Sequence, residues 1–118
     1  MDLVDVTRVR GLLERRPAAR QRLFTAQELA CCADRRDPVP RLAARFAAKE
    51  AVGKAIGSGV VVWREIEVLG GGTEVPLVHL HGATAAAARR LGIARIEVSL
   101  SHTASYAVAV AAALTERP

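Results

Sequence analysis

Aromatic side chains are almost missing from this sequence of 118 residues, which has two phenylalanines, one tryptophan and one tyrosine. Alanine and valine are plentiful instead, so we expect a core built from small side chains. The chain offers little to stack on bases, and it has no zinc-finger, glycine-rich phosphate loop or RNA-recognition signature. These absences make nucleic acid a weak candidate partner, and a small basic nucleic-acid binder is kept only as a third hypothesis.

Cysteine is equally scarce, and the chain has only the adjacent pair Cys31 and Cys32. Such a pair suits neither a four-ligand zinc site nor an ordinary disulfide. We therefore interpret both as small buried residues in a reducing cytosol. No signal peptide and no apolar run of membrane-spanning length is visible, so we expect a soluble, cytoplasmic protein without a membrane partner.

Negative charge is in short supply, because 17 lysines and arginines outnumber 12 acidic residues and give a formal charge of +5. Acidic partners are the expected consequence: nucleic acid, phosphorylated small molecules or an acidic protein. The length predicts a single domain over residues 1–118, at the small end for burying a core. Assembly into an oligomer would be an easy way to bury more surface.

The most informative stretch is RLAARFAAKEAVGKAIGSG, residues 41–59, which predicts a long helix. It follows two prolines, is rich in good helix formers and ends in glycines. At about 100° per residue, one side of this helix collects Leu42, Ala43, Phe46, Gly53 and Gly57. Glu50 points toward that apolar side, with Lys54 one turn beyond it.

Glu50 and Lys54 have two interpretations. The first is an ordinary ion pair between helix neighbours. The second is a carboxylate that binds a divalent cation, with an ammonium beside it to neutralise a phosphate on that cation. The apolar surroundings favour the second, because an unpaired buried charge is costly.

The remaining elements are predicted to surround this helix. Residues 1–10 predict a short strand that runs into a helix near Thr7, with Gly11 as a candidate break. The basic stretch Arg15–Arg22 is expected to be exposed. Thr25 and Glu28 have capping-box spacing, so a helix should run from about Ala26 toward Asp34.

The second half of the chain is rich in β-branched residues, which favour strands. It predicts strands at Val60–Trp63, Ile66–Leu69 and Leu77–Leu80, a turn at Gly70–Gly72, a helix at Ala83–Leu91, and a hairpin of Ile96–Ser101 with Tyr106–Leu114 around a turn at His102. The order predicts an α+β fold, with an antiparallel sheet packed around the long central helix.

Five segments occur in a specific order: DLVDVTRV, RLFTAQEL, RFAAKEAVGKAIGSG, WREIEV and VSLSHTASYAVAV. Together they resemble the holo-acyl-carrier-protein synthases, the small 4′-phosphopantetheinyl transferases, over nearly the whole chain. The resemblance implies a homotrimer with active sites at its subunit interfaces. It also implies transfer of the phosphopantetheine arm of coenzyme A to a serine of apo-acyl carrier protein, in fatty acid or polyketide synthesis.

The same resemblance assigns roles to individual residues. It implies that Mg²⁺ is bound by Asp2 and Glu50, that Lys54 contacts the transferred phosphate, and that Arg8 faces the acidic carrier protein. The residues implied near coenzyme A are Arg45, Lys54, Gly57 and His102. The general base stays open among a metal-bound water or hydroxide, a nearby carboxylate and His102.

The start of the chain departs from the family pattern. The family usually has a short strand with a Gly-x-Asp step before its aspartate, whereas Asp2 follows only Met1. A metal ligand at a chain terminus tends to fray unless it is tied down. The second hypothesis is therefore a catalytically weakened module of the same fold that binds a carrier protein or coenzyme A.

Overall fold

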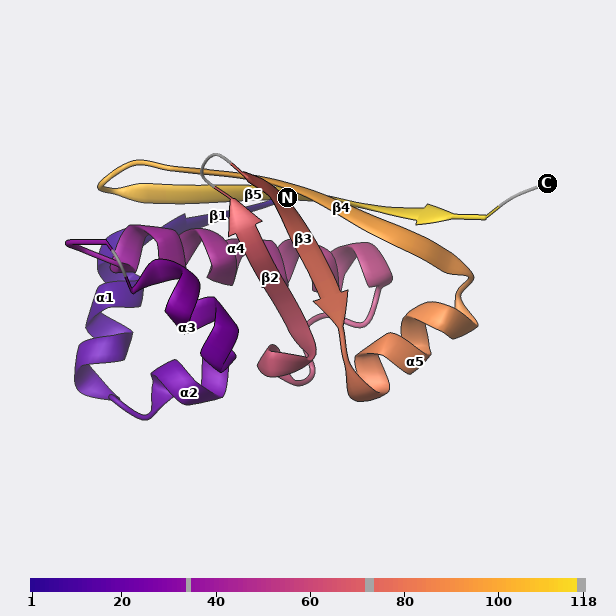
Figure 1. The fold of residues 1–118 in the computed structure, drawn as a ribbon, viewed down its shortest axis with the longest axis horizontal. Coiled ribbons are helices and arrows are strands. Elements are labelled where there is room, and N and C mark those ends of the chain that lie inside the picture. Colours follow the sequence, from indigo (N-terminus) through magenta and orange to yellow (C-terminus); the bar gives the residue numbers. More distant parts are fainter. Residues whose placement is uncertain (34, 72–73, 117–118) are drawn as a thin grey trace.

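The computed structural model describes residues 1–33, 35–71 and 74–116. Its elements, in chain order, are β1 (Asp2–Asp5), α1 (Val6–Arg15), α2 (Ala19–Leu23), α3 (Ala26–Cys32), α4 (Val39–Ile56), the 3-10 helix η1 (Trp63–Glu65), β2 (Ile66–Gly71), β3 (Glu74–Leu80), α5 (Gly82–Arg90), β4 (Ile93–His102) and β5 (Tyr106–Thr115). Helices and two antiparallel sheets confirm the predicted α+β fold (Figure 1). Within the described part, no helix has the length and apolar character needed to cross a membrane.

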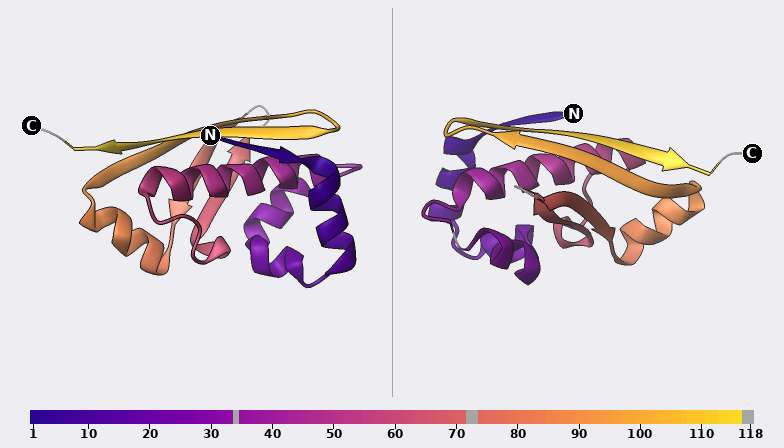
Figure 2. Two further views of the ribbon diagram at one scale, coloured as in Figure 1. Left: turned by 180° about the vertical axis from the view of Figure 1, so that it is seen from behind. Right: turned by 45° about the horizontal axis from the view of Figure 1, so that its top comes forward.

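The long helix α4 lies along the inner face of a three-stranded sheet with the order β1-β5-β4 (Figures 1 and 2). The helix ends at Gly57, whose φ of 96° is the left-handed conformation that favours glycine after a helix. Ala47, Ala48 and Ala51 pack against Ala109 of β5. These small side chains let the helix and the sheet approach closely, as the composition predicted.

A second sheet, made of β2 and β3 only, lies against another side of α4. Since β2 has one strand partner, its outer edge needs side chains to satisfy its backbone groups. Alternate residues on that edge are bound by buried charged groups: Arg45 donates to the carbonyls of Val68 and Gly70, and Lys49 donates to the carbonyl of Ile66. Buried charge on α4 thus replaces the missing strand.

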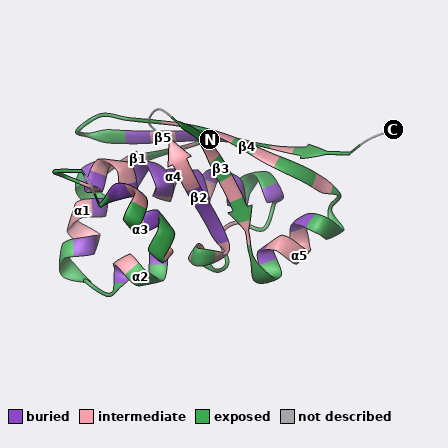
Figure 3. Ribbon diagram, in the orientation of Figure 1, coloured by how far each residue is buried: buried purple, intermediate pink, exposed green. Residues whose placement is uncertain are grey.

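Lys49 also belongs to a buried ion pair. Its Nζ lies 2.7 Å from Glu28 Oε1, and both side chains are fully buried. Glu28 forms the predicted capping box with Thr25 at the start of α3, and its second oxygen accepts from the N–H of Val68. This one carboxylate therefore connects α3, α4 and β2. Figure 3 shows that α4 is buried along most of its length.

Two local expectations are wrong. Gly11 does not break α1, which runs through to Arg15 after Asp5 caps its first turn by accepting from the N–H of Thr7 at 2.8 Å. The predicted strand at Val60–Trp63 is absent; this described stretch leads into η1. The stretch Arg15–Arg22 is mostly exposed, as expected, and buries only Ala19 of α2.

Other predictions hold or fall outside the described residues. The capping box and the strands, helix and hairpin after residue 66 are confirmed, with β3 and β4 starting three residues earlier than predicted. Gly72 of the predicted turn and Asp34 at the predicted end of α3 lie outside the described residues. Cys32 is buried, Cys31 is half-buried, and both are free thiols.

Candidate active site

Asp2 and Lys54 meet where β1 passes the C-terminal half of α4. Lys54 Nζ donates to Asp2 Oδ1 at 2.9 Å, although the two residues are 52 positions apart. Asp2 is also held by the backbone, because β1 pairs antiparallel with β5 and places Asp2 opposite Ala109. Strand pairing and the ion pair together tie down the first residues of the chain.

Glu50 lies half-buried on α4 beside this pair. Burial raises the pKa of the Glu50 carboxyl and the negative charge of Asp2 raises it further, while Lys54 and Arg8 oppose the shift. Glu50 forms no ion pair with any residue that the structure describes. Lys54 pairs with Asp2 instead, so the interpretation as an ordinary ion pair between helix neighbours does not hold.

The second oxygen of Asp2, Oδ2, is buried without a hydrogen-bond partner among the described residues. Buried polar atoms nearly always have a partner, so an orphaned carboxylate oxygen next to a second acidic group needs an explanation. A cation or a proton is the physical remedy for two carboxylates that face the same space.

A pocket of about 680 Å³ opens beside these acids, within the size range of small-molecule sites. Asp2 and Glu50 line it from β1 and α4, and α1 contributes Arg8, Leu12 and Arg15. The α1 residues recur at intervals of four and three and therefore share one face of that helix. Acidic, basic and apolar side chains thus meet in one hollow, which we call the acid pocket.

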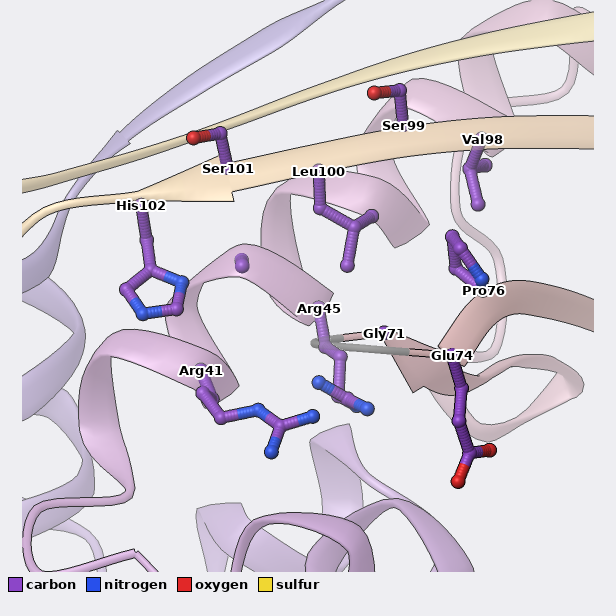
Figure 4. Close-up of a pocket in the computed structure, with 11 residues that line it drawn as sticks. Arg41, Arg45, Gly71, Glu74, Pro76, Val98, Ser99, Leu100, Ser101 and His102 are labelled. Carbon is purple, nitrogen blue, oxygen red and sulfur yellow. The ribbon is translucent and has the colours of Figure 1, made fainter.

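Arg45 and His102 occupy a different hollow, the arginine pocket, of about 340 Å³ (Figure 4). The guanidinium groups of Arg41 and Arg45 lie below the ring of His102, while Ser99 and Ser101 point to the other face of β4. Burial lowers the pKa of His102, and the positive charges of Arg41, Arg35 and Arg45 lower it further.

The structure does not bring the two groups of predicted residues together within one chain. Arg45 and Glu50 are five positions apart on α4, which places them about 140° apart around the helix. Asp2 and His102 both lie on the inner face of the sheet, with α4 packed against that face. Gly57 ends the helix one turn after Lys54, on the side of the acid pocket.

The whole arrangement matches a known family. The profile described as the 4′-phosphopantetheinyl transferase superfamily matches residues 1–111. This chain belongs to that superfamily. One relative of this transferase chain is the holo-[acyl-carrier-protein] synthase of Moorella thermoacetica, which is 43% identical over 113 residues covering 94% of this chain and 88% of the relative.

Solved structures agree with this membership. The holo-[acyl-carrier-protein] synthase of Neisseria meningitidis superposes on this transferase chain with a TM-score of 0.86 at 30% identity, covering 97% of this chain and 94% of the other. The enzyme of Helicobacter pylori, solved in complex with coenzyme A, gives a TM-score of 0.82 at 25% identity and covers 96% of each chain.

Two features of this superfamily member were missed at the sequence level. Arg41 lines the arginine pocket and Lys49 is fully buried, and no role was predicted for either residue. Their spacing indicates a shared role, because Arg41, Arg45 and Lys49 recur every four residues and so form one cationic stripe along α4. Of the apolar side predicted for α4, Leu42, Ala43 and Gly53 are buried, and the helix also buries Arg45 and Lys49 of this stripe.

Proposed function

We propose that this protein transfers the 4′-phosphopantetheine group of coenzyme A to a serine of an apo-acyl carrier protein, giving holo-carrier protein and adenosine 3′,5′-bisphosphate. The observation that carries the proposal is the cluster of Asp2, Glu50 and Lys54, in a chain that matches the transferase superfamily over residues 1–111. In this reaction the serine oxygen forms a bond to the phosphorus of the pantetheine arm, and the bond from that phosphorus to the oxygen of the leaving nucleotide breaks.

The residues of the acid pocket fit a divalent cation. Among the described residues, Asp2 Oδ2 has no hydrogen-bond partner and Glu50 has no ion-pair partner. Carboxylates are the hard oxygen donors that Mg²⁺ prefers. The described residues contain no group of three or more histidines, cysteines and acids suited to a metal, so substrate oxygens and water would complete the coordination. Bound there, Mg²⁺ would supply positive charge against the pyrophosphate of coenzyme A.

Lys54 supplies the second positive charge. Its side chain is 62% exposed and can turn toward a phosphate, whereas the side chain of its partner Asp2 is only 12% exposed and would then depend on the bound cation for its charge. An ammonium aimed at the oxygens where charge develops favours departure of the nucleotide. Gly57 ends the helix just beyond Lys54, and a Cβ there would meet nothing within 4 Å, which leaves open space beside the lysine.

The arginine pocket is the proposed binding site for a further phosphate of coenzyme A. Arg41, Arg45 and His102 line it, and guanidinium groups are well suited to phosphate oxygens. Arg45 is 1% exposed and already donates to two carbonyls, so we assign it to shaping the pocket as well as to binding. The pocket lies on another side of α4 from Glu50, so a neighbouring subunit is needed to bring both groups to one substrate.

A homotrimer would provide that neighbour. The outer face of β5 carries apolar side chains that the described chain leaves uncovered: Tyr106 is 54%, Val110 49% and Leu114 39% exposed. Leu3 of β1 pairs with Val108, lies on the same face and is 67% exposed. An apolar sheet face of this kind supports burial between copies of the chain.

We assign carrier docking to α1. Arg8 lies at the rim of the acid pocket, with Leu12 and Arg15 further along the same face of the helix. Acyl carrier proteins are acidic helical bundles, so a surface with two arginines around a leucine offers charge attraction with an apolar anchor. A docked carrier would hold its serine next to Glu50 and Lys54.

The deciding experiment is incubation of the protein with coenzyme A, Mg²⁺ and apo-acyl carrier protein, followed by intact-protein mass spectrometry. We expect the carrier to gain one phosphopantetheine group and expect a chelator to abolish the gain. Binding of carrier or coenzyme A without any mass gain would instead support the weakened binding module. Apo-carriers of fatty acid and polyketide synthesis should be compared in parallel.

A further inference from the structure

Arg10 and Asp37 form a bidentate ion pair between α1 and the segment that leads into α4. Arg10 Nη1 donates to Asp37 Oδ1 at 3.1 Å, and Nη2 donates to Oδ2 at 2.6 Å. Asp37 Oδ1 also accepts from the N–H of Val39 at 3.2 Å, at the first turn of α4. Both oxygens of this carboxylate are therefore occupied, and the link spans 27 positions of sequence.

The pair sits at the border of a cationic hollow continuous with the arginine pocket. Arg41 and His102 line both hollows, and the second one adds Arg35, Arg36 and Asp37. Asp37 is its single acidic side chain among the described lining residues. Three arginines, Arg35, Arg36 and Arg41, line the same hollow as this carboxylate.

Stability is a weak account of this ion pair. The side chains of Arg10 and Asp37 are 39% and 46% exposed, and exposed ion pairs contribute little to folding. What the pair changes is the distribution of charge. Arg10, which does not line the hollow, balances the negative charge of Asp37. The positive charges of Arg35, Arg36 and Arg41 are then left to bind an incoming anion.

We propose that Arg10 is a positioning residue for the arginine pocket: it holds Asp37 away from Arg35, Arg36 and Arg41 and so keeps those arginines available for a phosphate of coenzyme A. The proposal rests on the proposed function of that pocket. Without Arg10, the Asp37 carboxylate competes with the phosphate for the same guanidinium groups. Arg10 thereby favours substrate binding without touching the substrate.

A second effect of the pair is mechanical, because it also tethers the segment before α4. The two effects separate in a double variant. Asp37→Asn removes the competing charge but retains an amide oxygen that can accept from the N–H of Val39. If Arg10 acts through charge, the loss caused by Arg10→Gln disappears once Asp37 is Asn; if it acts as a tether, the loss remains.

The experiment measures the affinity of the full-length protein for adenosine 3′,5′-bisphosphate by isothermal titration calorimetry, without carrier protein, so that docking on α1 plays no part. We expect Arg10→Gln to bind roughly 5- to 10-fold more weakly, as for loss of the net contribution of about one ordinary hydrogen bond. Arg10→Gln/Asp37→Asn should return to the wild-type affinity or exceed it, and Asp37→Asn alone should bind at least as tightly as wild type.

Arg90→Gln on α5 is the matched control, since it removes one exposed positive charge outside both pockets. Unchanged affinity of Arg10→Gln, or a double variant as weak as Arg10→Gln, overturns the inference while leaving the proposed function standing. A wild-type protein that does not bind the bisphosphate overturns both. Thermal unfolding of every variant confirms that the compared proteins are folded.

Discussion

Lys49 and Glu50 are neighbours in sequence that occupy opposite electrostatic environments. Lys49 is fully buried, and burial lowers its pKa while the charge of Glu28 opposes the shift. Glu50 is half-buried, has a raised pKa and has no ion-pair partner within the described chain. Lys49 therefore stabilises the fold through its buried ion pair, whereas the charge of Glu50 is left for a cation to neutralise.

Replacing Glu50 should separate stability from activity. Because the folded-state pKa of Glu50 is raised, its ionised form destabilises the fold, and the cost is complete once the pH exceeds that pKa. Metal-free Glu50→Gln should therefore melt at a higher temperature than wild type at neutral pH, with the difference vanishing as the pH falls below the pKa of the unfolded chain. Circular dichroism with a chelator present measures this.

The same variant should lose Mg²⁺-dependent turnover by orders of magnitude in the carrier-modification assay. Glu116→Gln, an exposed acid near the end of β5, is the control and should change neither property. Near-normal turnover of Glu50→Gln would remove this residue from the metal site.

Lys49→Met tests the buried ion pair. It leaves the Glu28 carboxylate buried without its cation, which should cost about 3–5 kcal/mol of unfolding free energy. The double variant Lys49→Met/Glu28→Gln should recover part of that loss. Lys54→Met makes the same change at an exposed site and should cost under about 1 kcal/mol while lowering turnover. Equal losses in urea denaturation for Lys49→Met and Lys54→Met would contradict this division.

At the scale of the element, α1 is the proposed docking helix. Arg8→Glu reverses one charge on its carrier-facing side, so the KM for carrier protein should rise roughly tenfold or more, with a smaller salt dependence, while the KM for coenzyme A stays near wild type. Steady-state kinetics with each substrate varied in turn measure this. Arg90→Glu on α5 is the control, and equal effects of Arg8→Glu on both KM values would exclude a docking role.

Two helical glycines predict opposite outcomes for the same substitution. A Cβ at Gly53 would lie 2.6 Å from the backbone carbon of Gly59 and 2.8 Å from the N of Val60, so Gly53→Ala should cost about 1–3 kcal/mol by displacing the segment after α4. A Cβ at Gly11 would meet only the mobile end of Arg15, so Gly11→Ala should stabilise α1 by about 0.5–1 kcal/mol. Denaturant unfolding compares the two variants, and a stabilising Gly53→Ala would contradict the close packing.

At the scale of the whole molecule, the outer sheet face should control assembly. Val110→Asp places a charge in the middle of the apolar face and should convert the proposed trimer into monomers. Turnover should be lost with it, because the proposed shared site takes its two pockets from different subunits. Val61→Asp makes the same change at a 70% exposed site before η1 and should leave assembly intact. Size-exclusion chromatography with light scattering measures both. A monomeric wild-type protein with full turnover would overturn the shared-site proposal.

The sequence by itself determined most of the local structure, and its family resemblance predicted that Asp2, Glu50 and Lys54 share one site. The capping box at Thr25, the glycine stop of α4 and the alternating strands depend on hydrogen bonds and periodicities within a few residues, so they could be predicted without tertiary information. The strand predicted at Val60–Trp63 failed because β-branched propensity is weak beside the geometry of a chain leaving a helix through glycines.

Only the tertiary structure decided which charges meet. Lys54 pairs with Asp2, 52 positions away, because pairing of β1 with β5 brings the start of the chain beside α4. Arg45 and Lys49 are buried because the open edge of β2 presents carbonyls that need donors. The contact of Lys54 with Asp2 leaves no periodic trace in the sequence, since it depends on packing between distant segments. The four-residue spacing of Arg45 and Lys49 marks a shared face of α4, but only the fold places the carbonyls of β2 opposite that face.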